Sequence, residues 1–156
     1  MISEYWMWAT WLTKVFLYLS VAFVVGGFFC YVLLRQYLVI KESLLKYITI
    51  GAGLGLISST LGFFILNGSF ANSGLIGMWD LTYLNILINT PTGQIQIIRS
   101  ISFALLLIIM LVKLSRRKME VSITESTIFI ILLTPILFSF SQLGHVANLP
   151  FFAQIL

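Results

Sequence analysis

His145 is the only histidine of this 156-residue chain, and it follows the last long apolar stretch, in the run from Ser139 to Ala147. An imidazole can bind a transition metal or titrate near neutral pH. In the alternative structural role, the ring ends a helix and hydrogen-bonds to backbone or to polar groups linked to Arg99. Because the chain has no second histidine, His145 cannot build a multi-histidine metal site.

Two methionines offer a second kind of metal-binding group. Thioether sulfur suits Cu(I), and Met7 shares a face of the first apolar segment with Trp11, four residues on. Met78 lies in a loop that we place on the same side of a membrane as His145. For Met7 alone, filling a gap among apolar neighbours is the favoured interpretation.

Arg99 lies about two turns inside the third apolar segment. An arginine at that depth costs a few kcal/mol or more unless it is paired or hydrated, so we expect it to face inward. Asp80 and Glu4 are the acidic residues on the same side, and either could neutralise it. Lys14, one turn beyond Trp11, is expected to snorkel to the outer interface or to face an internal partner.

Composition places the chain in a membrane, since 60% of the residues are hydrophobic and only 9% are charged. Four segments are long and apolar enough to cross a bilayer core of about 30 Å. Backbone groups in lipid must be satisfied within each segment. The sequence therefore predicts one all-α domain over 1–156, a polytopic membrane protein with four transmembrane helices over about 8–34, 47–66, 95–114 and 127–143.

Basic residues indicate the sidedness of these spans. They lie between the first and second segments and again between the third and fourth, at Arg35, Lys41, Lys46 and Lys113 to Lys118. Both connections are therefore predicted to be cytoplasmic, with both termini and the loop 67–93 on the outer, periplasmic side. The net charge of +4 thus reflects membrane sidedness, and we expect a lipid bilayer and no nucleic acid as partner. Nothing ahead of the first segment resembles a signal peptide, so we expect a retained helix.

The outer loop is predicted to contain a short interfacial helix over about 78–89, because so long a loop without secondary structure is unusual in a compact protein. Thr90 is placed to N-cap the third span, with Pro91 as its first residue. In the second span, small residues recur at helical spacing and predict a face for close helix packing. These residues are Gly51, Gly55, Ser59 and Gly62.

A family resemblance rests on several short motifs of the sequence. Trp79-Asp80 is followed by the turn Thr90-Pro-Thr-Gly93, then by Arg99, a further apolar span and a basic loop. The last span ends in Ser141-Gln-Leu-Gly144-His145-Val-Ala. This arrangement resembles the CopD copper-resistance family of bacterial inner-membrane proteins, and its motif positions here are Thr90, Gly93, Ser141 and Gly144.

The resemblance implies that copper moves between periplasm and cytoplasm or is delivered at the membrane. Copper would arrive from the outer side, where His145, Met78 and Met7 are predicted, and we expect at most a transient Cu(I) site. The usual members of the family are about twice as long. The chain is therefore a short homologue, a truncated member or a subunit completed by a second polypeptide, and we expect a homo-oligomer or a second membrane subunit, with a periplasmic copper-binding protein as a further partner.

Two other functions remain open on the sequence. A haem-binding redox subunit would need His/Met ligation or a haem shared with a partner, because bis-imidazole ligation requires two histidines. A non-catalytic structural subunit would need only the packing face and the apolar C-terminus. We expect no enzyme, since no nucleophile and base stand at a known spacing and no nucleotide-binding motif is present.

Overall fold

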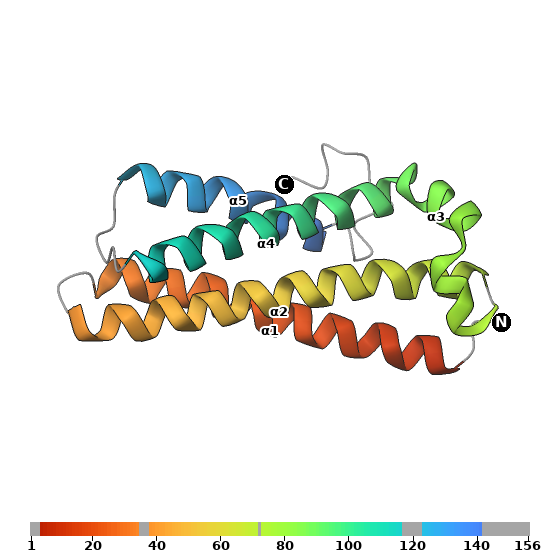
Figure 1. Ribbon diagram of the computed structural model, residues 1–156, viewed down its shortest axis with the longest axis horizontal. Helices are drawn as coiled ribbons and strands as arrows, with labels where there is room; N and C mark the ends of the chain where they lie inside the picture. Colours follow the sequence, from red (N-terminus) through yellow and green to blue (C-terminus); the bar gives the residue numbers. More distant parts are fainter. Residues whose placement is uncertain (1–3, 35–37, 72, 117–122, 142–156) are drawn as a thin grey trace.

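The computed structural model describes residues 4–34, 38–71, 73–116 and 123–141. The elements in these ranges are all helical, as the composition predicted. Four long helices run along the molecule, and a 3-10 helix and a short α-helix occupy one end (Figure 1). In chain order they are α1 (Glu4–Leu33), α2 (Leu38–Ala71), η1 (Gly74–Trp79), α3 (Leu81–Ile88), α4 (Pro91–Ser115) and α5 (Ile123–Ser141).

Among the described residues, three helices are long and apolar enough to cross a membrane: α1, α2 and α4. The fourth predicted span, 127–143, corresponds to α5, whose apolar part, Thr124–Phe140, is shorter. Positions 142 and 143 lie outside the described residues. The structure therefore supports a helical membrane protein and leaves the count of four spans as a prediction.

The second helix is longer than its predicted span of 47–66, because it begins at Leu38 and ends at Ala71. Hydropathy detects only the apolar part, whereas charged residues continue the same helix beyond it. Glu42 and Lys46 form an ion pair of 2.8 Å one turn apart, which supports this polar extension.

Helix α2 packs against both α1 and α4, and α5 packs against α4. Aromatic pairs join α5 to α1: the rings of Phe28 and Phe129 lie 3.9 Å apart and those of Tyr18 and Phe140 lie 5.2 Å apart, centre to centre. The buried residues of α1 recur every three or four positions and form one inward stripe. They are Leu17, Ser20, Val24, Gly27 and Tyr31, after Trp6 near the helix start.

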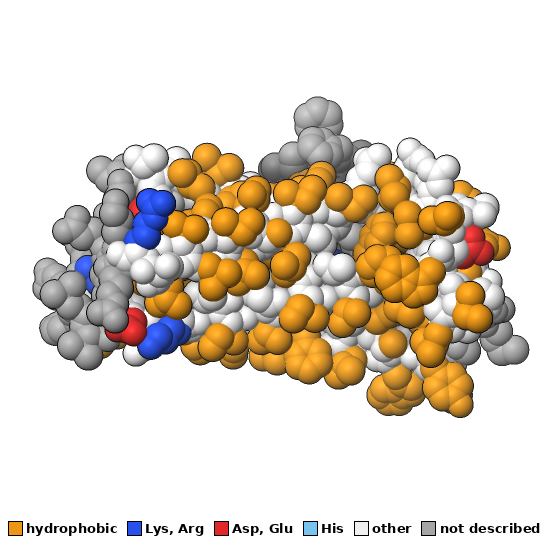
Figure 2. Space-filling view, in the orientation of Figure 1, with side chains coloured by type: hydrophobic (Ala, Val, Ile, Leu, Met, Phe, Trp, Pro, Cys, Tyr) orange, Lys and Arg blue, Asp and Glu red, His pale blue; other side chains and the backbone are white. Residues whose placement is uncertain are grey.

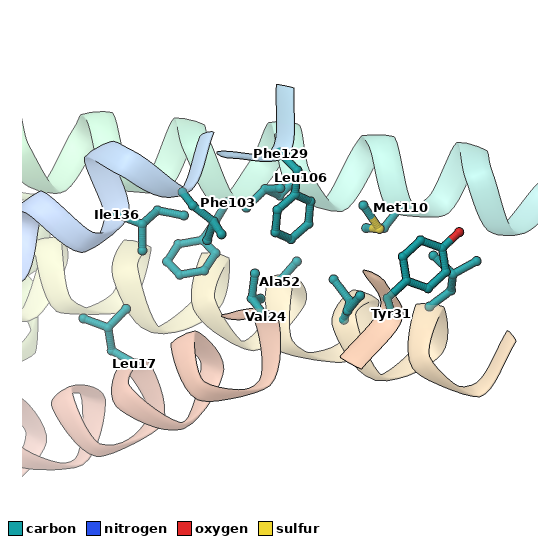
Figure 3. Close-up of a cluster of buried hydrophobic side chains, with 12 residues drawn as sticks. Leu17, Val24, Tyr31, Ala52, Phe103, Leu106, Met110, Phe129 and Ile136 are labelled. Carbon is teal, nitrogen blue, oxygen red and sulfur yellow. The ribbon is translucent and has the colours of Figure 1, made fainter. Parts of the chain in front are cut away.

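Phe103 of α4 lies at the centre of the apolar core with no exposed surface (Figure 3). It fits because Gly55 of α2 has no side chain; a Cβ there would lie 2.3 Å from the Phe103 ring. Gly51 instead faces Phe23 and Val24 of α1. The predicted small-residue face of α2 thus serves two neighbouring helices, one on each side.

The outer loop forms η1 and α3 in place of the single helix predicted over 78–89. Asp80 separates them because its side chain accepts a hydrogen bond from the backbone N–H of Thr82 at 2.9 Å and caps α3. The buried amide of Asn67 donates to the carbonyl oxygens of Gly77, Met78 and Asp80 at 3.1–3.3 Å. These bonds hold the loop against the end of α2.

Candidate functional site

Arg99 lies in the interior of the bundle with only 3% of its surface exposed, as expected of an arginine at this depth. Its Nε donates to Ser59 Oγ of α2 at 3.1 Å, and its Nη1 donates to Ser139 Oγ of α5 at 3.5 Å. Ser59 also shares a 2.8 Å hydrogen bond with Ser100 of α4. Arg99 therefore joins three helices through hydroxyl groups.

Asp80 and Glu4 were predicted as acids that could neutralise Arg99, and within the described part of the chain neither forms an ion pair with it. There, the two ion pairs are Glu42–Lys46 and Lys113–Glu125. Asp80 uses its carboxylate to cap α3, and Glu4 is exposed in the first turn of α1. The Asp80 carboxylate accepts a hydrogen bond from the start of α3. The described hydrogen-bond partners of the buried Arg99 side chain are neutral serine hydroxyls.

A polar cavity of about 160 Å³ opens beside Arg99, between α1, α2 and α4. Two cationic side chains line it, Arg99 and Lys14, together with Gln96 and several hydroxyl groups. Lys14 was expected to snorkel or to face an internal partner; its side chain borders this cavity and is exposed. No acidic side chain is among the cavity's described lining residues.

The turn before α4 is built as the sequence predicted. Thr90 Oγ1 accepts a hydrogen bond from the Gly93 N–H at 3.1 Å and donates to the Leu87 carbonyl at 2.7 Å. Gly93 passes so close to Leu87 that a Cβ at position 93 would lie 1.9 Å from the Leu87 oxygen. The two motif residues thus set where α4 begins, three turns or less before Arg99.

The predicted metal ligands lie only partly within the described residues, so their grouping stays a prediction. Met7 is 48% exposed on α1, whereas Met78 packs in η1 beside Gly68 and Trp6. His145 and Gly144 lie outside the described residues, and for Ser141 only its place in α5 is described. Within the described ranges, no group of three or more histidine, cysteine, aspartate or glutamate residues could hold a metal ion.

Sequence reasoning missed three polar residues around Arg99. Gln96, Ser100 and Arg99 recur on one face of α4 at spacings of three and four, a local signal of a polar stripe. The sequence motif indicated Ser141, whereas the hydroxyl that contacts Arg99 is that of Ser139, two positions earlier. Ser59 was noted only as a small packing residue, because nothing local indicates which helix its hydroxyl will meet.

At the opposite end of α4, Lys113 pairs with Glu125 of α5 and lies over the ring of Tyr31, 5.4 Å from its centre. The side chain of Lys113 is 7% exposed and that of Glu125 is 41% exposed. This buried cation therefore has both a carboxylate and an aromatic face as partners. It is a structural contrast to Arg99 on the same helix.

These features define a helical membrane protein with an open cavity between α1, α2 and α4, which two cationic and several polar side chains line. A family model described as "Copper resistance protein D-like, N-terminal domain" matches residues 1–150. The chain belongs to this copper-resistance family, which confirms the resemblance seen in the sequence and gives it a copper-related membrane function. No curated protein and no solved structure matches the chain.

Proposed function

We propose that this protein moves copper ions across the bacterial inner membrane, or delivers them there, as a non-enzymatic membrane component. The observation that carries the proposal is the copper-resistance family model, which covers residues 1–150. The three long apolar helices agree with a protein that acts within the bilayer. Copper is the substrate in this proposal.

The proposed topology has α5 as a fourth span and both termini in the periplasm. The ends of α1 and α4 and the starts of α2 and α5 lie at one end of the bundle, and η1 and α3 lie at the other (Figure 1). Lys and Arg side chains gather toward the first of these ends, while hydrophobic side chains cover the middle of the visible face (Figure 2). The positive-inside rule makes the basic end cytoplasmic.

Copper is proposed to meet the protein at its outer end, with Met78, Met7 and His145 as ligands of a transient Cu(I) site. Soft sulfur and imidazole suit this ion. The polar cavity is a poor route for a bare copper cation, because Arg99 and Lys14 make it positive. A route through the membrane therefore requires a second copy or a second subunit, and a periplasmic copper-binding protein would supply the ion.

Cu(I) titration of the purified chain against a competing chelator tests this proposal. His145→Ala and Met78→Leu should each weaken binding roughly tenfold, the equivalent of about 1.4 kcal/mol. Met110→Leu is the matched control, because Met110 is a core methionine with 5% exposure, and its affinity should equal that of the unaltered protein. Unaltered protein that binds no more Cu(I) than His145→Ala would contradict the proposal and favour the structural-subunit alternative.

Two further measurements separate the remaining alternatives. An absorbance spectrum of the purified protein without a Soret band removes the haem-binding function. Native mass spectrometry across several detergents tests the oligomer or second subunit. A single monomeric species throughout would count against assembly into a larger path.

A further inference from the structure

The charge balance around the polar cavity is incomplete in the described structure. Arg99 and Lys14 both line the cavity, and neither forms an ion pair with a described carboxylate. A guanidinium group carries five N–H donors, and Arg99 uses one on Ser59 and one on Ser139. A buried cation with unused donors is stabilised by an anion.

Three hydroxyl groups of the cavity already donate to backbone oxygens. Thr10 donates to Trp6 O at 2.7 Å and Ser58 donates to Leu54 O at 2.7 Å, each within its own helix. Thr13 donates to backbone oxygens of α1 in the same way. The hydrogens of these three hydroxyl groups are therefore committed, and the two cationic groups are the charged donors of the cavity, beside the neutral donors of Thr92 and Gln96.

Gln96 provides a second, independent sign of a missing ligand. Gln96 lines the cavity, its side chain is buried with 9% exposure, and its Oε1 is a buried atom without a hydrogen-bond partner. A buried acceptor without a donor is costly, and proteins usually satisfy such groups. The bound species should therefore accept hydrogen bonds from Arg99 and Lys14 and donate one to Gln96.

We propose that the cavity between α1, α2 and α4 binds a phosphate group, with Arg99 and Lys14 as its cationic ligands and Gln96 Oε1 as its acceptor. Hydrogen phosphate has both kinds of group, since its charged oxygens accept and its P–OH donates. The cavity of about 160 Å³ is several times the space that one water requires, so a small oxyanion fits. The proposal does not depend on copper.

The same chemistry is offered by an anionic phospholipid. In phosphatidylglycerol, the phosphate would meet the two cations and a glycerol hydroxyl would donate to Gln96. Thr10, Lys14 and Thr92 lie in the first turns of α1 and α4, at the end of the bundle that carries α3. In the proposed topology, this end of the bundle faces the outer leaflet and its headgroups.

The test measures the thermal stability of the full chain, purified in detergent without copper, in two arms. The first arm compares inorganic phosphate with chloride at equal ionic strength. The second compares phosphatidylglycerol with diacylglycerol of the same acyl chains. Lys14→Gln and Arg99→Gln are the test variants, and Lys46→Gln is the control because Lys46 is an exposed lysine in the polar extension of α2.

Phosphate should stabilise the unaltered protein and Lys46→Gln, and Lys14→Gln should weaken its apparent affinity roughly tenfold. Lys14→Gln keeps the test decisive if Arg99→Gln does not fold, because Lys14 is exposed and has no ion pair in the described ranges. Stabilisation by phosphatidylglycerol alone would identify the lipid as the source. The proposal is overturned if neither phosphate source stabilises the protein, if chloride acts equally, or if Lys14→Gln keeps the full effect.

Discussion

Arg99 and Lys113 are buried cations on the same helix, about 21 Å apart along its axis at 1.5 Å per residue. Lys113 has a carboxylate partner in Glu125 and an aromatic partner in Tyr31. Arg99 has two serine hydroxyls and borders a polar cavity. The charge of Lys113 is neutralised by a residue of α5, whereas the described hydrogen-bond partners of Arg99 are neutral.

The turn before α4 should tolerate substitution least among the segments at the end of the bundle that carries α3. Gly93→Ala would place a Cβ 1.9 Å from the Leu87 oxygen, and we expect a loss of about 3 kcal/mol in stability, because backbone must move to relieve the contact. Gly26→Ala is the control, since a Cβ there meets nothing within 4 Å. Unfolding in detergent and SDS mixtures measures both.

If Gly93→Ala were as stable as Gly26→Ala, the turn would not set the register of Arg99 in α4. The position of Arg99 would then be set by its hydrogen bonds to Ser59 and Ser139 alone.

The buried Lys113 charge should require its carboxylate partner, Glu125. Glu125→Leu leaves Lys113 without its carboxylate, and we expect a loss of about 2 kcal/mol, below the range for a fully buried pair because the Glu125 side chain is 41% exposed. The double variant Lys113→Met with Glu125→Leu should lie within about 1 kcal/mol of the unaltered protein, since no charge remains to be buried.

A double-mutant cycle in denaturant measures this coupling. If the stability losses of the two single substitutions add in the double variant, Lys113 and Glu125 are not coupled. Lys113 and Arg99 would then differ less than their surroundings suggest.

The hydroxyl contacts of Arg99 should contribute less. Ser59→Ala removes the acceptor of Arg99 Nε, and we expect a loss of about 1.5 kcal/mol, at the low end for a hydrogen bond to a charged group. Ser102→Ala is the matched control, because Ser102 is equally buried at 4% but bonds only to Ile98 O of its own helix. Equal stability of the two variants in thermal denaturation would refute a role for Ser59 in holding the arginine.

Local features of the fold were predictable because their causes lie within a few residues. Thr90 and Pro91 mark the start of α4, and the apolar segments mark the helices. A helix was predicted over 78–89, and the structure has η1 up to Trp79 and α3 from Leu81, because Asp80 caps α3. A side chain near its own backbone often satisfies that backbone first.

The candidate site was only partly predictable. The inward position of Arg99 follows from the cost of an arginine in lipid. Its partners Ser59 and Ser139 do not follow, because each lies forty positions away in the chain. Met7 and Met78 share an end of the bundle, yet Met7 is exposed and Met78 packs inward against Gly68, a difference that only helix rotation decides.

The sequence by itself determined the class of structure and the family. Hydropathy, charge asymmetry and capping act locally, so they can be read without knowing which helices meet. Tertiary structure decided that, among the described residues, Lys113 has a carboxylate partner and Arg99 has none, and that Lys14 and Gln96 line the same cavity. Those outcomes depend on how four helices rotate and pack against one another, because contacts between distant segments are set by side-chain fit across the bundle.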